Sequence, residues 1–181
     1  YVVLGERMCD LDAITALLTR HSATQLTDPA PMGDALAQIM AAAENVPDHG
    51  KLKPWRFKIM TGDERLVLGN LMAESLRGRL VDMPSAQRDS ECAKEQAKPL
   101  RAPMIIAVAA HLTPIAKIPD IEQIIAAGCA AHAMLLAAHA LGFGGQWKTG
   151  PAARDGHVKR GLGFEVTDEI VGFIYLGSIA N

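Results

Sequence analysis

The longest apolar stretch of the chain runs from Ile121 to Leu141. No Asp, Glu, Lys or Arg occurs between Glu122 and Lys148, although charged residues make up 21% of the whole chain. A helix that is apolar on all its faces is buried, either inside a large core or at an interface between subunits. We therefore predict a long central helix here, and the glycines that begin at Gly142 predict a left-handed turn at its end.

A membrane-spanning helix is the alternative interpretation of this stretch, since about 18 or more apolar residues can cross a bilayer. However, His132 and His139 lie two turns apart on one face, and no basic cluster flanks the segment in the positive-inside pattern. We therefore favour a buried helix and expect no membrane partner. The two histidines are separated by roughly 10 Å along such a helix, which favours polar contacts over shared ligation of a metal ion.

Shorter patterns predict the remaining elements. Apolar residues at helical spacing from Leu11 to Leu18 predict a first amphipathic helix, with Asp10 as its N-cap and its end near Arg20. Further helices are predicted at 34–46, 64–80, 85–97 and 153–160, and strands at 55–60, 104–110, 144–149 and 170–177. The sum is an α+β domain in which helices pack against a sheet of about four strands.

Length and composition narrow the function classes. The 181 residues predict one domain over 1–181, with 1–9 peripheral and 81–98 a variable polar insert. A net charge of −2, a pI near 6.3 and 4% aromatic residues argue against a nucleic-acid partner. Three widely spaced cysteines without a C-x-x-C motif predict reduced thiols in a cytoplasmic protein and no metal site. The run Tyr1 to Leu4 is too short for the core of a signal peptide.

Two polar clusters precede the first predicted strand, and each has an ordinary alternative. Arg20-His21-Ser22 stands at a helix end and could hold a phosphate, or it is simply a solvated terminus where a cation suits the helix dipole. His49, with Asn45 upstream, lies in a proline-bounded loop, which is where binding residues concentrate, or this is an ordinary surface loop.

A third cluster, Gln146-Trp147-Lys148, brings an amide, an aromatic ring and a cation together after the long helix. Alternatively, Trp147 belongs to the core and Lys148 to the surface. The chain has no nucleophile elbow, no P-loop and no dinucleotide fingerprint. Several hydrogen-bond donors with little acid–base machinery indicate an anionic, planar ligand whose own chemistry does the work, as in cofactor enzymes.

Four segments of the chain, in order, resemble motifs of the nitroreductase family of FMN-dependent oxidoreductases, and most closely its small bacterial NAD(P)H nitroreductases. These segments are Arg20-His21-Ser22, Val46-Pro47-Asp48-His49 through Pro54-Trp55-Arg56-Phe57, Ala127-Gly128-Cys129 through Gly142-Phe143-Gly144-Gly145-Gln146-Trp147-Lys148-Thr149-Gly150, and Val171 to Gly177. The resemblance covers about Leu11 to Gly177. Each segment alone is weak evidence, whereas four in the family order are strong evidence.

The resemblance implies a three-layer α+β sandwich. Its mixed, mostly antiparallel sheet of four to five strands carries helices on both sides, and the long helix lies at the core of a homodimer with FMN at the interface. By similarity, Arg20, His21 and Ser22 hold the FMN phosphate and ribityl chain, and Lys148 adds charge there. Gln146 and Trp147 add main-chain and packing contacts, and Asn45 and His49 reach the flavin from the other subunit.

The implied reaction has two half-reactions at one flavin: NADPH or NADH delivers a hydride, and a nitroaromatic or quinone-type acceptor then takes the electrons. No side chain is needed as a general acid, so no catalytic residue is predicted. The chain departs from the family pattern where His21, Asn45 and Lys53 replace Arg, Arg and Gln. Two alternatives stay open: another flavin chemistry such as reductive dehalogenation or flavin breakdown, or a non-enzymatic FMN-binding or interaction protein on the same scaffold.

Overall fold

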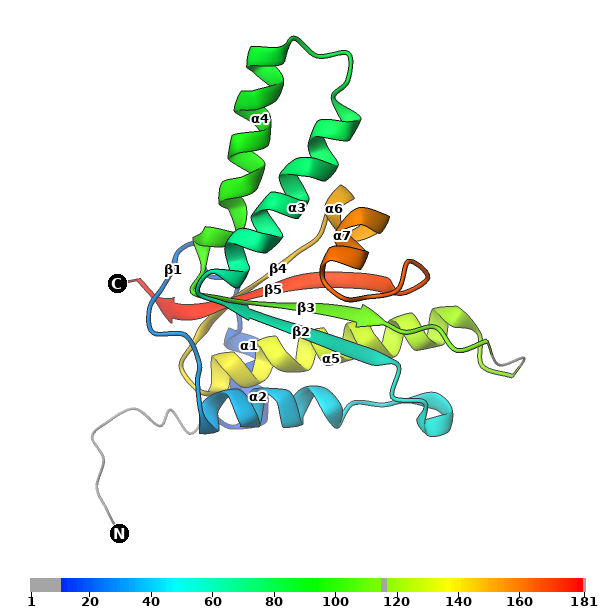
Figure 1. Ribbon diagram of the computed structural model, residues 1–181. Helices are drawn as coiled ribbons and strands as arrows, with labels where there is room; N and C mark the ends of the chain where they lie inside the picture. The colour runs from blue at the N-terminus through cyan, green and yellow to red at the C-terminus, as the bar shows by residue number, and fades with distance from the viewer. Residues whose placement is uncertain (1–10, 115–116, 181) are drawn as a thin grey trace.

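The computed structural model describes residues 11–114 and 117–180, which form a five-stranded sheet covered by helices on both faces (Figure 1). The strands are β1 (Leu26–Thr27), β2 (Trp55–Thr61), β3 (Met104–Ala110), β4 (Gly144–Lys148) and β5 (Glu169–Ile179). Their order is β1-β5-β3-β2, with β4 also paired to β5. All described pairings are antiparallel, which sharpens the expected mixed sheet to an antiparallel one.

Two central strands carry the core. Every residue of β3 is buried, as the continuous apolar run predicts for a strand with both faces covered. β5 is the longest strand, and it pairs with β3 on one edge and with both β4 and β1 on the other. The short strand β1, which the sequence patterns did not predict, therefore joins the segment after the first helix to the end of β5 and lies close to β4.

One face of the sheet is covered by α5 (Asp120–Ala140) and α2 (Asp34–Glu44). Ile39 and Ala43 of α2 are fully buried where α2 packs on α5, and the buried side of α5 includes Ala127, Ala130 and Met134. By length and composition α5 could also span a membrane, but 44% of its apolar window is buried in this structure. Its other side, which includes Ile121 and Ile125, is open.

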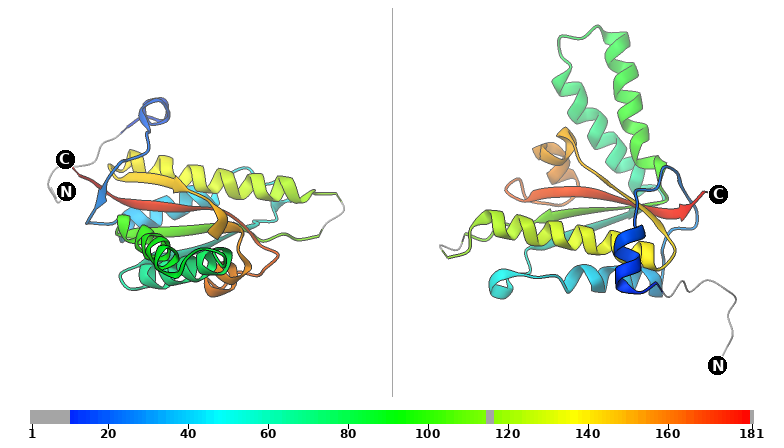
Figure 2. Two further views of the ribbon diagram at one scale, coloured as in Figure 1. Left: turned by 90° about the horizontal axis from the view of Figure 1, so that it is seen from above. Right: turned by 180° about the vertical axis from the view of Figure 1, so that it is seen from behind.

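The opposite face carries α3 (Glu64–Arg79), α4 (Ser85–Ala97), α6 (Pro151–Arg154) and α7 (Gly156–Gly161). The helices α3 and α4 form a hairpin that stands away from the sheet (Figures 1 and 2). Two 3-10 turns, η1 (His49–Lys51) and η2 (Lys98–Arg101), connect helices to strands β2 and β3. The layers confirm the expected sandwich.

Two element predictions need correction. The helix expected at 153–160 is two short helices, because Asp155 has an extended backbone and its carboxylate caps α7. The first helix, α1 (Ala13–Thr19), begins later than expected: its N-cap is Asp12, whereas Asp10 lies outside the described residues, as do residues 1–9. Its predicted apolar side faces outward, since Ile14, Leu17 and Leu18 are exposed.

Candidate functional site: a cationic pocket beside strand β4

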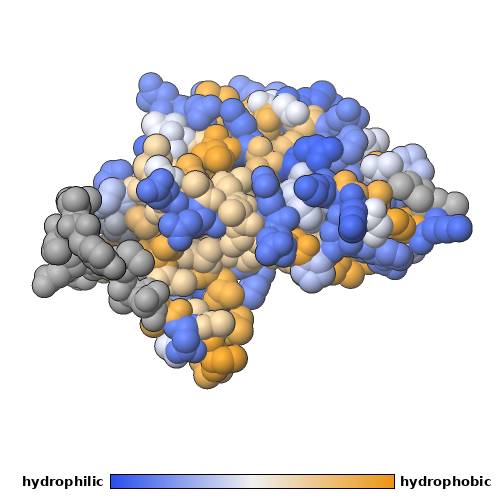
Figure 3. All heavy atoms as spheres, turned by 90° about the horizontal axis from the view of Figure 1, so that it is seen from below, coloured by the Kyte–Doolittle hydropathy of each residue, from blue (hydrophilic) through white to orange (hydrophobic). Residues whose placement is uncertain are grey.

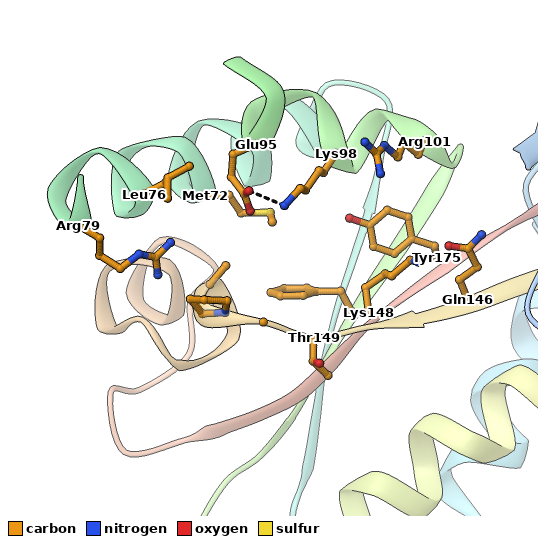
Figure 4. Close-up of a pocket in the computed structure, with 14 residues that line it drawn as sticks. Met72, Leu76, Arg79, Glu95, Lys98, Arg101, Gln146, Lys148, Thr149 and Tyr175 are labelled. Atoms are coloured by element: carbon orange, nitrogen blue, oxygen red, sulfur yellow. Dashed lines mark hydrogen bonds and ion pairs between the residues drawn. The ribbon is translucent and has the colours of Figure 1, made fainter. Parts of the chain in front are cut away.

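A pocket of about 400 Å³ lies between β4, β5 and the foot of the α3–α4 hairpin (Figure 4). Pockets of this size are within the range that holds small molecules and cofactors. Its floor is partly aromatic, since Phe173 and Tyr175 are two residues apart in β5 and therefore lie on the same face of that strand. Met72 and Leu76 of α3 supply an apolar wall.

Cations dominate the charged lining of this pocket. Arg79, Lys98, Arg101 and Lys148 line it, against one carboxylate, Glu95. The Lys98 ammonium donates to Glu95 at 2.5 Å, so that carboxylate is already partnered. The pocket therefore has a net positive charge and suits an anionic ligand.

Tyr175 contributes a hydroxyl group to the pocket. In Figure 4 its ring lies between Arg101 and Lys148, with the hydroxyl directed into the cavity on the side of Lys98. Burial raises the pKa of Tyr175 to about 12. The group therefore remains a protonated hydrogen-bond donor over the whole physiological range.

Strand alternation separates the three residues of the Gln146-Trp147-Lys148 cluster. Gln146 and Lys148 line the pocket, whereas Trp147 points to the opposite face of the sheet. There its indole Nε1 donates to the Val171 carbonyl at 3.0 Å, and its ring packs over Gly172. Trp147 thus occupies the core position that was the alternative interpretation of this cluster.

The segment Arg20-His21-Ser22 follows α1 and lies next to β4. The Ala23 N–H donates to the Gly145 carbonyl at 3.1 Å, and the Gln146 side-chain amide donates to the Ala23 carbonyl. Gly144 has no room for a side chain, because a Cβ there would collide with Leu26 and Ile179. This close crossing brings the predicted phosphate-binding segment to the end of the strand that lines the pocket.

The other predicted pair, Asn45 and His49, lies elsewhere in the chain. Asn45 is the C-cap of α2, and His49 Nδ1 lies 2.5 Å from Glu122 Oε2 in the first turn of α5. His139, beside His21, is in the last turn of the same helix. His139 is 17 residue positions after Glu122, which corresponds to about 25 Å along the helix. One chain therefore does not bring His49 and Arg20 to a common site.

Motif reasoning missed Arg79, Lys98, Arg101, Phe173 and Tyr175. A usable signal existed for four of them. Lys98 and Arg101 stand three residues apart shortly before the buried strand β3. Phe173 and Tyr175 stand two residues apart in β5, so their side chains lie on the same face of the strand. Which of these side chains share a cavity depends on where the foot of the α3–α4 hairpin lies relative to β5, and no local sequence pattern reveals that position.

Comparison with known proteins gives a consistent result. A sequence model of the Nitroreductase family matches residues 17–178. An Escherichia coli (strain K12) protein that carries the name "Putative NAD(P)H nitroreductase YdjA" is 36% identical over 168 residues, covering 93% of this chain and 88% of its own length.

Solved structures agree on the fold. The Nitroreductase-like family protein from Bacillus cereus has a TM-score of 0.80 at 21% identity, covering 99% of this chain and 90% of that one. A nitroreductase with bound FMN from Bacteroides fragilis NCTC 9343 has a TM-score of 0.69 at 19% identity, covering 94% of this chain and 89% of that one.

Proposed function

The chain belongs to the nitroreductase family, and on this premise we propose that it is an FMN-dependent oxidoreductase that uses NADPH or NADH to reduce nitroaromatic or quinone-type acceptors. The observation that carries the proposal is the cationic pocket beside β4, with Lys98, Arg101 and Lys148 around an aromatic floor. A planar ring system that becomes anionic when it is reduced matches both properties of the lining.

The residues present fit FMN by their chemistry. The side chains of Phe173 and Tyr175 supply an apolar surface for a ring, and the backbone at Thr149 and Gly150 lines the same wall. Gly150 has a φ of 138°, a conformation that favours glycine, and no atom lies within 4 Å of the position a Cβ would take. The main chain can therefore approach a flat ligand closely.

Bound FMN would accept a hydride from the nicotinamide and pass two electrons to the acceptor. The protein's contribution is electrostatic. Lys98, Arg101 and Lys148 place positive charge where negative charge accumulates during reduction. Glu95 holds the Lys98 ammonium on the pocket side of η2 and offsets part of its charge. Tyr175 donates a hydrogen bond into the same space.

The phosphate end of the site is proposed at Arg20, His21 and Ser22. Arg20 presents a guanidinium fork that suits phosphate oxygens, and Ser22 adds a hydroxyl donor. The support for this end is its attachment to β4 through Ala23, Gly145 and Gln146, the strand whose next residues line the pocket.

We propose that Asn45 and His49 enter the site from a second copy of the chain, because α5 separates them from Arg20 by about 25 Å within one copy. The exposed apolar side of α1 and the open side of α5 supply the surface for a homodimer. Figure 3 shows apolar residues along the middle of this face and at its protruding lower end. We also propose that the enzyme is cytoplasmic, because it would use NADPH or NADH and because Cys92 and Cys129 are free thiols.

The decisive experiment is a visible spectrum of the purified protein after addition of FMN, followed by NADPH and NADH under anaerobic conditions. We expect a flavin band that either nucleotide bleaches and a nitroaromatic or quinone restores. A band that neither nucleotide bleaches would favour the non-enzymatic flavin-binding alternative. A nucleotide-bleached band that neither acceptor restores would favour another flavin chemistry.

The site assignment is tested by Arg20→Ala and Lys148→Ala, with Lys94→Ala as a control, since Lys94 pairs with Glu91 on the surface of α4. We expect both site variants to lose FMN affinity by about tenfold or more, the equivalent of one charge-assisted contact of 1.5–3 kcal/mol, and to keep the wild-type far-UV spectrum. Full flavin occupancy in Arg20→Ala would contradict the phosphate assignment.

A further inference from the structure

Two histidines that are far apart in sequence meet at the junction of α1 and α5. The ring centroids of His21 and His139 are 6.2 Å apart in an edge-to-face arrangement. His139 Nε2 lies 2.9 Å from the Thr19 hydroxyl, and His21 Nδ1 lies 3.1 Å from the Thr19 carbonyl oxygen. Arg20 lies between Thr19 and His21 in the sequence.

The hydrogen bonds define which ring nitrogens are free. The Thr19 hydroxyl uses its hydrogen to donate to the Thr15 carbonyl at 2.7 Å, so His139 Nε2 must be the donor to that hydroxyl. A carbonyl oxygen only accepts, so His21 Nδ1 is also a donor. When the rings are neutral, the unprotonated nitrogens are therefore His139 Nδ1 and His21 Nε2, and each can take up one proton.

Arg20 is the permanent cation beside the two rings, and no carboxylate is among the groups that shift the pKa of His139. Partial burial first, then the His21 ring and Arg20, lower the pKa of His139 from its usual 6.5. Elements packed against α5 carry other charged or titratable groups, which do not contribute to this shift: Asp12, Asp34, Glu44, His49, Lys51, Arg56, Lys58, Lys148 and Glu169. An anion bound at the cluster would reverse the effect and favour protonation.

We propose that His21 and His139 form a proton-coupled binding site for a phosphate monoester dianion, so that binding of FMN draws protons onto this histidine pair. The proposal rests on the proposed function, which assigns the phosphate to Arg20 and Ser22. His21 replaces a permanent cation of the family pattern, and His139 adds a titratable partner from α5. The positive charge of the site is then acquired when the phosphate arrives.

The test compares FMN with riboflavin, which has the same ring and no phosphate, by flavin-fluorescence titration between about pH 7 and pH 9. The second phosphate pKa is about 6, so the phosphate stays dianionic over this range. We expect the Kd of FMN to rise by up to about tenfold per pH unit for each proton taken up, and the Kd of riboflavin to stay constant. Calorimetry in two buffers of different ionisation enthalpy counts the protons directly.

Variants identify the groups that take up the protons. We expect His139→Gln to reduce the proton uptake on FMN binding without changing riboflavin affinity, and His21→Arg to keep FMN affinity with a weaker pH dependence. His157→Gln is the matched control, because His157 of α7 is an exposed histidine that pairs with Glu74 of α3. This substitution should leave proton uptake unchanged. Far-UV spectra confirm that each variant is folded.

The outcomes separate this inference from the proposed function. FMN binding without proton uptake, or with an uptake that His139→Gln leaves intact, would overturn the histidine proposal and leave the flavin assignment standing. Failure of the wild-type protein to bind either flavin at any pH would overturn the proposed function itself, and the histidine proposal with it.

Discussion

The Tyr175 side chain illustrates how burial sets the chemistry of a single residue. Its phenol lies at the base of the pocket, and its pKa is raised to about 12 chiefly because burial penalises the charged form. Nearby Arg101 acts in the opposite direction and Glu95 in the same direction as burial. Burial therefore outweighs the local cation, and the group acts as a neutral donor.

We expect the ionisation of Tyr175 to be delayed in an alkaline titration followed by tyrosinate absorbance. Because the folded pKa of about 12 exceeds the unfolded value of 10.0, the folded state holds the proton longer. The associated stability is complete below pH 10 and is lost as the pH rises toward 12. Tyr175→Phe should remove the late step, whereas loss of a step near pH 10 in that variant would refute the assignment.

Strand alternation had an equally local effect on β4. The sequence presents Gln146, Trp147 and Lys148 as one cluster, but successive side chains of a strand point to opposite faces. Trp147 therefore fills the α5 side of the core, where Gly172 leaves space for its ring. Gln146 and Lys148 face the pocket. The role of Trp147 in cofactor binding, through its main chain and its packing, stays a prediction.

At the scale of elements, α7 is anchored by its cap. The Asp155 carboxylate accepts from the His157 N–H at 2.8 Å and the Val158 N–H at 3.4 Å, and from the Ser75 hydroxyl of α3 at 2.5 Å. One carboxylate thus begins a helix and also joins it to the hairpin. These hydrogen bonds, led by the one from Ser75, lower the pKa of Asp155 below its usual 3.8.

We expect Asp155→Ala to lower the free energy of unfolding by about 1–2 kcal/mol, the range for loss of an N-cap. The same group makes stability pH-dependent: its contribution is present above pH 3.8 and is lost as the pH falls through the depressed folded pKa. Chemical denaturation at pH 7 and pH 3 measures both effects.

Asp12→Ala is the control, because Asp12 caps α1 in the same way but α1 buries only Ala16. Its effect on global unfolding should be smaller. Equal losses in the two variants would show that the bond from Asp155 to Ser75 adds nothing to the cap.

The α3–α4 hairpin positions the cations of the pocket. α4 is polar and was expected to be a surface insert, yet it leads directly into η2, which carries Lys98 and Arg101 to the edge of β5. Gly69 allows the close approach, since a Cβ there would collide with the backbone carbonyl of Gln96. A segment that looked peripheral in sequence therefore leads to side chains that line the pocket.

At the scale of the whole molecule, the single chain leaves a large apolar surface uncovered. Leu18 is 81% exposed and Ile14 64% exposed on α1, and Ile121 and Ile125 are exposed on α5. Exposed apolar surface on two elements of one face is typical of an interaction site. In the proposed homodimer, a second copy of the chain covers this surface and supplies Asn45 and His49.

We expect Leu18→Glu to shift the protein from dimer to monomer in sedimentation equilibrium and to reduce FMN affinity in parallel, because the proposed site is completed across the proposed interface. Val81→Glu is the control, since Val81 is also exposed, at 65%, but lies between α3 and α4. If Leu18→Glu remained a dimer with wild-type FMN affinity, α1 would not belong to the interface.

The hydrophobic pattern of the sequence determined most of the helices and strands, although not β1, and the family resemblance implied the layers. The apolar runs at 104–110 and 121–141 predict β3 and α5 because burial on both faces of a strand, or around a helix, leaves few polar positions. The four family-like segments indicated the family, because their order along the chain matches the order of the family motifs. The sequence also placed Arg20 and Lys148 among the candidate residues.

Only the tertiary structure decided which of these residues share a site. The pocket depends on contacts between β4, β5 and η2, which are remote in sequence, and on the foot of the hairpin beside them. The pairing of His21 with His139, and the 25 Å or so of α5 between Arg20 and His49, likewise arise from packing. Local patterns reflect burial and periodicity, whereas a site is made by side chains that meet only after distant elements have packed.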